Sequence, residues 1–238
     1  MDQLIVALDV ESAGKALDLA DRLRGLAGGY KIGKRLFTLE GPAIVRALVE
    51  RGDRVFLDLK FHDIPNTVSA AVSAATSLGI WMVNVHASGG RQMMEAAREA
   101  AADTAAREGR QAPLVIGVTV LTSMNAQALA DVGVPVPIME QVERLARLAR
   151  AAGLDGVVAS PQETRMIREA CGPDFIIVTP GIRGGAAPVS GMDDQERTMS
   201  APEAIAAGAT YIVVGRPIIA ATDPRHAAQK LIGLGSRF

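Results

Sequence analysis

Hydrophobic residues along this chain gather in short runs, and the longer segments between the runs mix apolar with polar residues. The runs are rich in Val and Ile, which is typical of strands buried on both faces in a parallel sheet. The pattern predicts eight strands: Leu4–Asp9, Tyr30–Gly33, Val55–Lys60, Met82–His86, Leu114–Leu121, Gly156–Ser160, Phe175–Pro180 and Tyr211–Gly215.

The segments between the runs carry signals for helix starts and stops. Gly52, Gly79 and Gly153 each follow an expected helix end, where glycine tolerates a left-handed backbone. Ser160 and Ser200 each precede a glutamate by three residues, which is the spacing of a capping box. The clearest predicted helices are Ser12–Ala27, Pro42–Arg51, Asn66–Leu78 and Ile138–Ala152.

Strands and helices alternate through the whole chain. Eight such units in 238 residues leave about thirty residues for each, the size of a βαβ module. We therefore expect an α/β protein in which residues 1–238 form one catalytic domain, a single (β/α)8 TIM barrel. The alternative is a doubly wound sheet, which usually has fewer strands. Its dinucleotide-binding forms carry a glycine-rich turn after the first strand, where this chain has Asp9-Val10-Glu11-Ser12.

The segment from Arg183 to Thr198 breaks the alternation, because it is rich in Gly, Pro and Asp and has no period. A loop of this length in a compact domain is usually a lid or a binding segment. It follows the seventh predicted strand, on the face where the active sites of barrels lie.

Composition narrows the classes of partner. The net charge is −1 and no block of like charges stands out, so we expect neither a nucleic-acid partner nor an anionic membrane. No apolar run approaches the ~20 residues of a membrane span. The single cysteine, Cys171, excludes an intrachain disulfide and fits a reducing compartment. We expect a cytoplasmic protein.

Polar residues at the carboxyl ends of barrel strands are the candidates for chemistry. Asp58 and Lys60 end the third strand on one face, and Asp63 follows three residues later. Lys31, in the second strand, could extend them into an alternating array of charges. An ordinary ion-pair network at the rim is the alternative. Between carboxylates Lys60 should stay protonated, which suits a general acid and not a Schiff-base nucleophile.

A second signal follows the seventh and eighth strands. Phosphate sites of barrels often form there, and these loops carry Gly181-Ile182-Arg183 and Gly215-Arg216-Pro217. Turn glycines with solvated arginines are the alternative. The three histidines have no metal-binding spacing, so we expect no metal.

The segment Asp58–Thr67, DLKFHDIPNT, resembles the signature of the orotidine 5′-phosphate decarboxylases. The shorter D-x-K-x-x-D pattern is shared with a sister family of magnesium-dependent sugar-phosphate decarboxylases. The resemblance extends along the chain to these further segments: Leu8-Asp9, Tyr30–Gly33, Leu121–Ser123, Thr179–Arg183, Asp194–Arg197 and Val214–Ile218.

The resemblance implies decarboxylation of orotidine 5′-monophosphate to UMP, the last step of de novo pyrimidine nucleotide synthesis, without a metal or cofactor. Lys60 would be the proton donor, with Asp58, Lys31 and Asp63 completing the charged array. The implied substrate-binding residues are Asp9, Lys31, Asp58, Leu59, Lys60, Phe61, His62, Asp63, Ile64, Pro65, Asn66, Thr67, Thr122, Ser123, Pro180, Arg183, Gln195, Gly215 and Arg216.

The resemblance also implies a homodimer in which Asp63, Ile64 and Thr67 reach the site of the neighbouring subunit. Two other functions stay open. One is the sister decarboxylase, which the His62–Thr67 continuation, HDIPNT, and Lys31 argue against. The other is a non-catalytic barrel that binds a phosphorylated ligand, which would need Arg183 and Arg216 but not Lys60 between aspartates.

Overall fold

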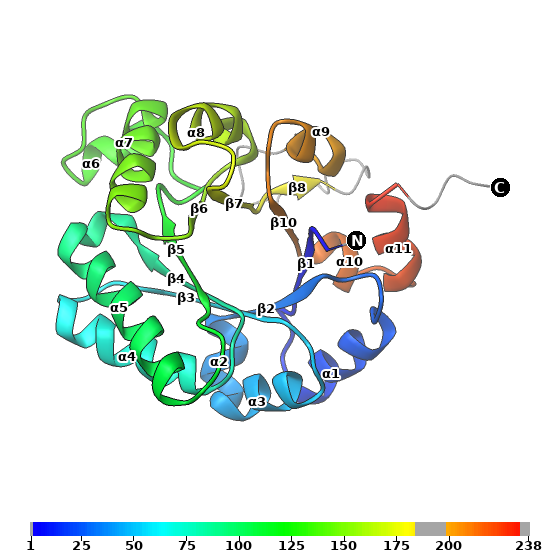
Figure 1. Ribbon diagram of the computed structural model, residues 1–238. Coiled ribbons are helices and arrows are strands. Elements are labelled where there is room, and N and C mark those ends of the chain that lie inside the picture. Colours follow the sequence, from blue (N-terminus) through cyan, green and yellow to red (C-terminus); the bar gives the residue numbers. More distant parts are fainter. Residues whose placement is uncertain (1, 184–198, 234–238) are drawn as a thin grey trace.

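The computed structural model describes residues 2–183 and 199–233, which contain a closed ring of parallel strands surrounded by helices (Figure 1). Each strand pairs with its neighbours in chain order, and β10 closes the ring on β1. The predicted (β/α)8 barrel is therefore confirmed, and the doubly wound alternative is wrong. The barrel strands are β1 (Leu4–Ala7), β2 (Gly29–Gly33), β3 (Val55–Phe61), β4 (Met82–His86), β5 (Leu114–Val118), β6 (Gly156–Val158), β7 (Ile176–Thr179) and β10 (Tyr211–Val214).

The helices form the outer layer of the barrel (Figure 1). They are α1 (Ala13–Arg22), α2 (Lys34–Glu40), α3 (Pro42–Glu50), α4 (Pro65–Ser77), α5 (Arg91–Arg107), α6 (Ala126–Asp131), α7 (Ile138–Ala151), α8 (Thr164–Cys171), α9 (Ala201–Ala206), α10 (Arg216–Ile219) and α11 (Pro224–Leu231). Two short 3-10 helices are η1 (Ala87–Gly89) and η2 (Pro161–Glu163). After β7, β8 (Ile182–Arg183) pairs with β9 (Met199–Ser200).

The two capping boxes predicted from the sequence are present in the structure. The backbone N–H of Ser160 donates to the Glu163 carboxylate at 2.8 Å, and Ser200 repeats this contact with Glu203 at 3.0 Å. Element ends are less well predicted. The first strand ends at Ala7 and not Asp9, and the fifth ends at Val118 and not Leu121. The third strand continues one residue further than predicted, to Phe61.

Alternation along the strands separates two apolar cores. Val55 and Leu57 face outward into the core between strands and helices. Phe56 faces inward, into the smaller cluster that fills the barrel. The interior cluster consists of Ile5, Ala7, Phe56, Met82, Ile116, Val178 and Val213. Because side chains alternate along a strand, Asp58 continues the inward face of Phe56 at the carboxyl end of β3.

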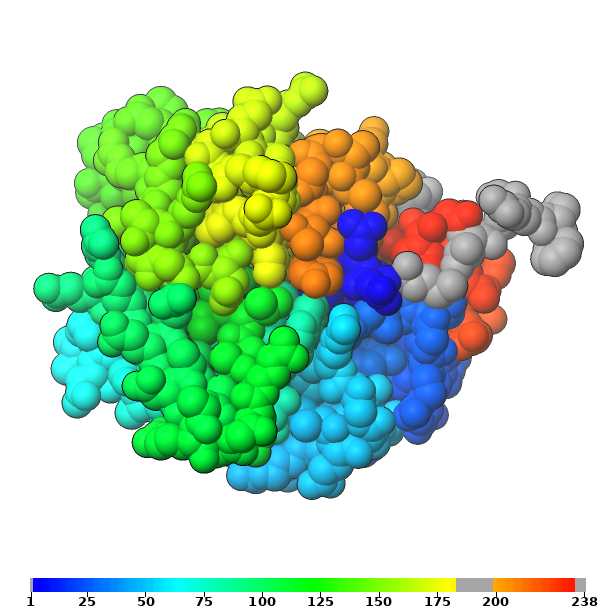
Figure 2. Space-filling model, viewed as in Figure 1, coloured from blue at the N-terminus to red at the C-terminus, as the bar shows by residue number. Residues whose placement is uncertain are grey.

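The first and last barrel strands hold the two ends of the domain together. Leu4 lies in register with Ile212, and Val6 with Val214. In the space-filling view the blue N-terminal residues lie against the orange segment that contains β10 (Figure 2).

Candidate active site

Four charged side chains meet at the carboxyl end of the barrel: Asp9 just after β1, Lys31 on β2, and Asp58 and Lys60 on β3. Lys31 Nζ, from β2, lies 3.1 Å from Asp9 Oδ1 and 3.4 Å from Asp58 Oδ2. Lys60 Nζ lies 2.6 Å from Asp58 Oδ1. The order of contacts is Asp9, Lys31, Asp58, Lys60, so that each cation lies next to a carboxylate. We call these four residues the charged cluster.

Asp58 lies at the centre of the charged cluster and is buried, with 8% of its surface exposed. Burial alone would raise the pKa of its carboxyl group. The ammonium groups of Lys31 and Lys60, with hydrogen bonds from Lys60 and Asn84, outweigh burial and lower this pKa below its ordinary value. The carboxylate is therefore ionised, and it holds two ammonium groups on its two oxygens.

Two glycines leave room around the cluster. A Cβ atom at Gly33 would lie 2.8 Å from Lys31 Nζ and 3.0 Å from Asp9 Oδ1, so a side chain there would displace the ammonium group. A Cβ atom at Gly215 would lie 3.8 Å from Asp9 Oδ2. Asp9 therefore lies between Lys31 and the loop that follows β10.

Asn84, on β4, is a site residue that the sequence reasoning missed. Its side-chain Nδ2 donates to Asp58 Oδ1 at 2.7 Å, and its Oδ1 accepts from the backbone N–H of Lys60 at 2.8 Å. It is fully buried. An amide inside an otherwise apolar strand, Met82-Val83-Asn84-Val85, was the signal that could have identified it, because a buried polar group needs partners.

The loop after β3 and the first turn of α4 carry the remaining signature residues. Asp63, Ile64, Asn66 and Thr67 are exposed, and Asp63 Oδ1 accepts from the backbone N–H of Ile64 at 2.7 Å. Among residues 2–183 and 199–233, no ion pair joins Asp63 to a lysine of the charged cluster. Within one chain, therefore, Asp9 belongs to the charged cluster and Asp63 is exposed to solvent.

Two histidines lie beside this loop. The rings of His62 and His86 have centroids 5.2 Å apart. Burial and the nearby His62, Lys34 and Lys60 lower the pKa of His86 to about 4. His86 is therefore neutral at physiological pH.

The expected phosphate residues that the structure describes follow two adjacent strands, β7 and β10. Because Ile212 of β10 is in register with Thr179 of β7, the loops after these strands start side by side. One contains Pro180 and leads into β8, and the other contains Gly215 and Arg216, where α10 begins. Gln195 lies outside the described residues.

The candidate base-contacting residues follow β5. Thr122 is half-buried and Ser123 is exposed, in a turn where Met124 N–H donates to Leu121 O at 2.9 Å. They lie after the carboxyl end of β5, the edge of the barrel that also carries the charged cluster.

Residues 2–183 and 199–233 contain no group of three or more His, Cys, Asp or Glu side chains placed to hold a metal ion. In the same residues no helix is both long and apolar enough to cross a membrane.

A closed barrel with buried, alternating carboxylates and ammonium groups at the carboxyl ends of its strands has the architecture of a (β/α)8-barrel enzyme. A sequence model of the Orotidine 5′-phosphate decarboxylase / HUMPS family matches residues 2–231, and the chain belongs to that family.

Individual relatives match nearly the full chain. The orotidine 5′-phosphate decarboxylase of Moorella thermoacetica is 54% identical over 231 residues, covering 97% of this chain and 90% of that protein. The one from Syntrophotalea carbinolica is 54% identical over 230 residues, covering 97% and 93%. The crystal structure of orotidine 5′-phosphate decarboxylase from Lactobacillus acidophilus superposes with a TM-score of 0.84 at 35% identity, covering 98% of this chain and 99% of that chain.

Proposed function

We propose that this protein is a carboxy-lyase that converts orotidine 5′-monophosphate to UMP, the last step of de novo pyrimidine nucleotide synthesis in the cytoplasm. The whole chain, 1–238, would act as one catalytic domain. One observation carries the proposal: the buried Asp58 carboxylate holds two ammonium groups, Lys31 and Lys60, at the carboxyl end of a family barrel.

Lys60 is the proton donor in this proposal. When the bond between carbon 6 of the pyrimidine and its carboxylate breaks, the electron pair stays on carbon 6 and carbon dioxide leaves. A fixed ammonium group at that carbon stabilises the developing carbanion and then transfers a proton to it. The neutral amine of Lys60 regains a proton from water. Asp58, at 2.6 Å, orients the ammonium group before the reaction.

In this proposal the remaining contacts with the substrate come from the same edge of the barrel. Asp9 binds a ribose hydroxyl, and Thr122 and Ser123 lie at the base. The residues assigned to the phosphate are Pro180, Arg183, Gln195, Gly215 and Arg216. The adjacency of β7 and β10 supports this assignment, because both phosphate loops start side by side and Gly215, in the second loop, lies next to Asp9. Binding energy from the remote phosphate is then available to organise the reacting groups.

The working form in this proposal is a homodimer. Asp63, Ile64 and Thr67 reach from one subunit into the site of the other, where Asp63 completes the alternation of charges. Two observations support it. Ile64 is 65% exposed in the single chain and lies next to Asp63, which makes no ion pair among the described residues.

The test is an ultraviolet assay with orotidine 5′-monophosphate in the presence of EDTA. We expect loss of the orotate absorbance with formation of UMP. Lys60→Ala should lower kcat by at least about 10⁴-fold, because it removes both the charge and the proton. Binding of UMP should survive in that variant. Near-normal turnover by Lys60→Ala would remove the proposed proton donor.

The same assay separates the two alternatives. Activity that returns only with added magnesium would indicate the sister decarboxylase chemistry. Binding of UMP with no turnover under either condition would indicate a barrel that binds phosphorylated ligands without catalysis.

A further inference from the structure

Strand β3 departs from regular pairing where its catalytic candidates lie. Leu57 pairs with Val83 and Phe61 with Val85, so four steps along β3 match two steps along β4. Two extra residues therefore bulge out of β3 opposite Asn84. Bulges of this kind re-aim side chains next to active sites. Here the bulge turns the backbone so that Asp58 and Lys60 direct their charges at each other.

The bulge has a conformational cost at Lys60. Its φ is +54°, and among residues 2–183 and 199–233 no other non-glycine residue has a positive φ. Side chains disfavour this region, so the surrounding structure has to hold the residue there. The backbone N–H of Lys60 has lost the regular strand partner, and Asn84 Oδ1 accepts its hydrogen bond at 2.8 Å instead.

The two ends of the Asn84 amide are fixed by chemistry. A carboxylate only accepts hydrogen bonds and a backbone N–H only donates them, so Nδ2 must face Asp58 and Oδ1 must face Lys60. The geometry points to Asn84 as a positioning residue for the decarboxylation proposed above. The Asn84 side chain holds the Asp58 carboxylate in position and also holds the strained backbone of Lys60, the proposed proton donor.

The roles of Asp58 and Lys60 depend on their relative position, because misplacement of reacting groups by about 1 Å costs on the order of 10²-fold in rate. Asn84→Ala should therefore lower kcat by about 10²-fold. The affinity for UMP should stay close to that of the wild type, since Asn84 makes its contacts with Asp58 and the Lys60 backbone.

Asn84→Asp is the sharper variant, because it keeps the shape and adds a second carboxyl group against Asp58. Two carboxyl groups sharing one site raise the pKa of one of them. Below that pKa, a protonated Asp at position 84 can donate to Asp58 and accept from Lys60, as the amide does. We therefore expect kcat of Asn84→Asp to be highest at low pH and to fall as pH rises, relative to the wild type.

Other titratable groups face the same point and contribute to the pH profile. They are Lys31 on β2, Lys60 on β3, His86 on β4 and Asp9 after β1. All four are present in the wild type and in both variants. The ratio of variant to wild-type kcat at each pH therefore isolates the group at position 84.

Thr76→Val is the matched control. Thr76 is also buried, and its hydroxyl donates to Val72 O at 2.8 Å within α4, away from the charged cluster. The Thr76→Val variant should be less stable than the wild type and should keep the wild-type kcat. The inference is overturned if Asn84→Ala keeps near-wild-type kcat, if it loses UMP affinity in parallel with kcat, or if Asn84→Asp shows a flat ratio. Absence of turnover by the wild type would instead contradict the proposed function.

Discussion

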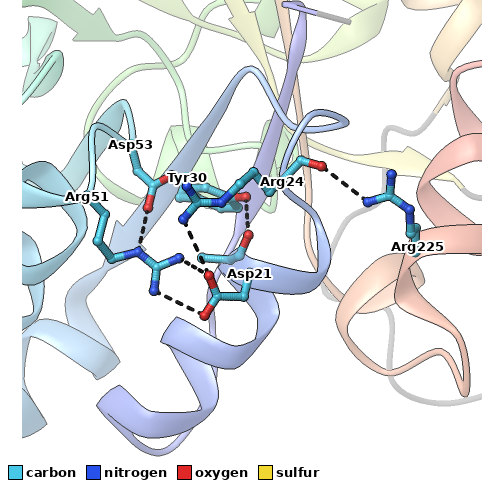
Figure 3. A network of polar contacts seen from close by, with 7 residues as sticks. Asp21, Arg24, Tyr30, Arg51, Asp53 and Arg225 are labelled. Carbon is cyan, nitrogen blue, oxygen red and sulfur yellow. Dashed lines mark hydrogen bonds and ion pairs between the residues drawn. The ribbon is translucent and has the colours of Figure 1, made fainter.

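Two polar networks in this protein use the same kinds of groups around a central carboxylate, which is enclosed in one network and exposed in the other. At the centre of the charged cluster the side chains of Lys31 and Asp58 are each 11% exposed, whereas those of Lys60 and Asp9 are 25% and 49% exposed. The second network joins α1, the start of β2, the end of α3 and α11 (Figure 3). There Arg51 contacts Asp21 at 2.7 Å and Asp53 at 3.2 Å, and the Asp21 side chain is 61% exposed.

The second network connects helices to strands and gathers Arg24 and Arg51 on the exposed Asp21, while Asp53, the other partner of Arg51, is 11% exposed. Arg225 Nη1, from α11, donates to the backbone oxygens of Arg22 and Arg24 at the end of α1, at 3.0 and 3.2 Å. The Arg24 side chain lies 3.4 Å from Asp21 (Figure 3). Solvent screens such exposed pairs, so each contributes little. In the enclosed cluster, screening is weak and each charge depends on its partners.

Asp58→Asn is expected to give the largest loss of stability. It keeps the shape but leaves the Lys31 and Lys60 ammonium groups without the carboxylate between them. Breaking a buried pair by removing one partner costs about 3 kcal/mol or more of the free energy of unfolding. Denaturant titration measures this. A variant as stable as the wild type would show that the cluster stores strain for function and does not stabilise the fold.

The pH dependence of that loss has a fixed sign. The folded-state pKa of Asp58 lies below its ordinary value, because Lys31 and Lys60 outweigh burial. Its contribution is therefore present above the unfolded pKa of about 3.9 and is lost as pH falls through the folded value. The difference between the wild type and Asp58→Asn should shrink in acid. A difference that stays constant would mean that ionisation of Asp58 is not what stabilises the wild type.

The contrast between the networks also explains what could be predicted from sequence. Lys31 and Asp58 interrupt apolar strands, so the pattern itself marked them. The role of Asn84 depends on a bulge that shifts register between β3 and β4, and residue spacing does not reveal a shift in register. In the proposed homodimer, the position of Asp63 relative to a second site depends on another chain. The alternation predicted a helix between the fourth and fifth strands, where α5 lies, but not its bounds, because its many alanines give a weak apolar period.

Tyr30, beside the exposed network, is expected to give an intermediate effect. Its hydroxyl donates to Ala20 O at 2.8 Å, and the residue is 3% exposed. Tyr30→Phe should cost about 1 kcal/mol at neutral pH, the usual net value of such a bond.

Burial, and then the nearby Asp53 carboxylate, raise the pKa of Tyr30 to about 12. The stabilisation is therefore present below the unfolded pKa of about 10 and is lost as pH rises toward the folded value. Unfolding of both proteins followed from neutral to alkaline pH should show the difference shrinking. Tyr211→Phe, at the other tyrosine of the chain, is the control that should keep the wild-type alkaline loss.

Asp21→Asn should give the smallest effect, about 0.5 kcal/mol or less, because exposed ion pairs contribute little. The amide keeps a hydrogen-bond acceptor for Arg51, and Asp53 stays in place as its second partner. About 1 M salt, which screens exposed charges within a few ångströms, should remove what difference there is. The same salt should leave the Asp58→Asn loss almost unchanged. If Asp21→Asn cost as much as Asp58→Asn, enclosure would not determine the free-energy cost of removing a carboxylate. The number of charge contacts would determine that cost instead.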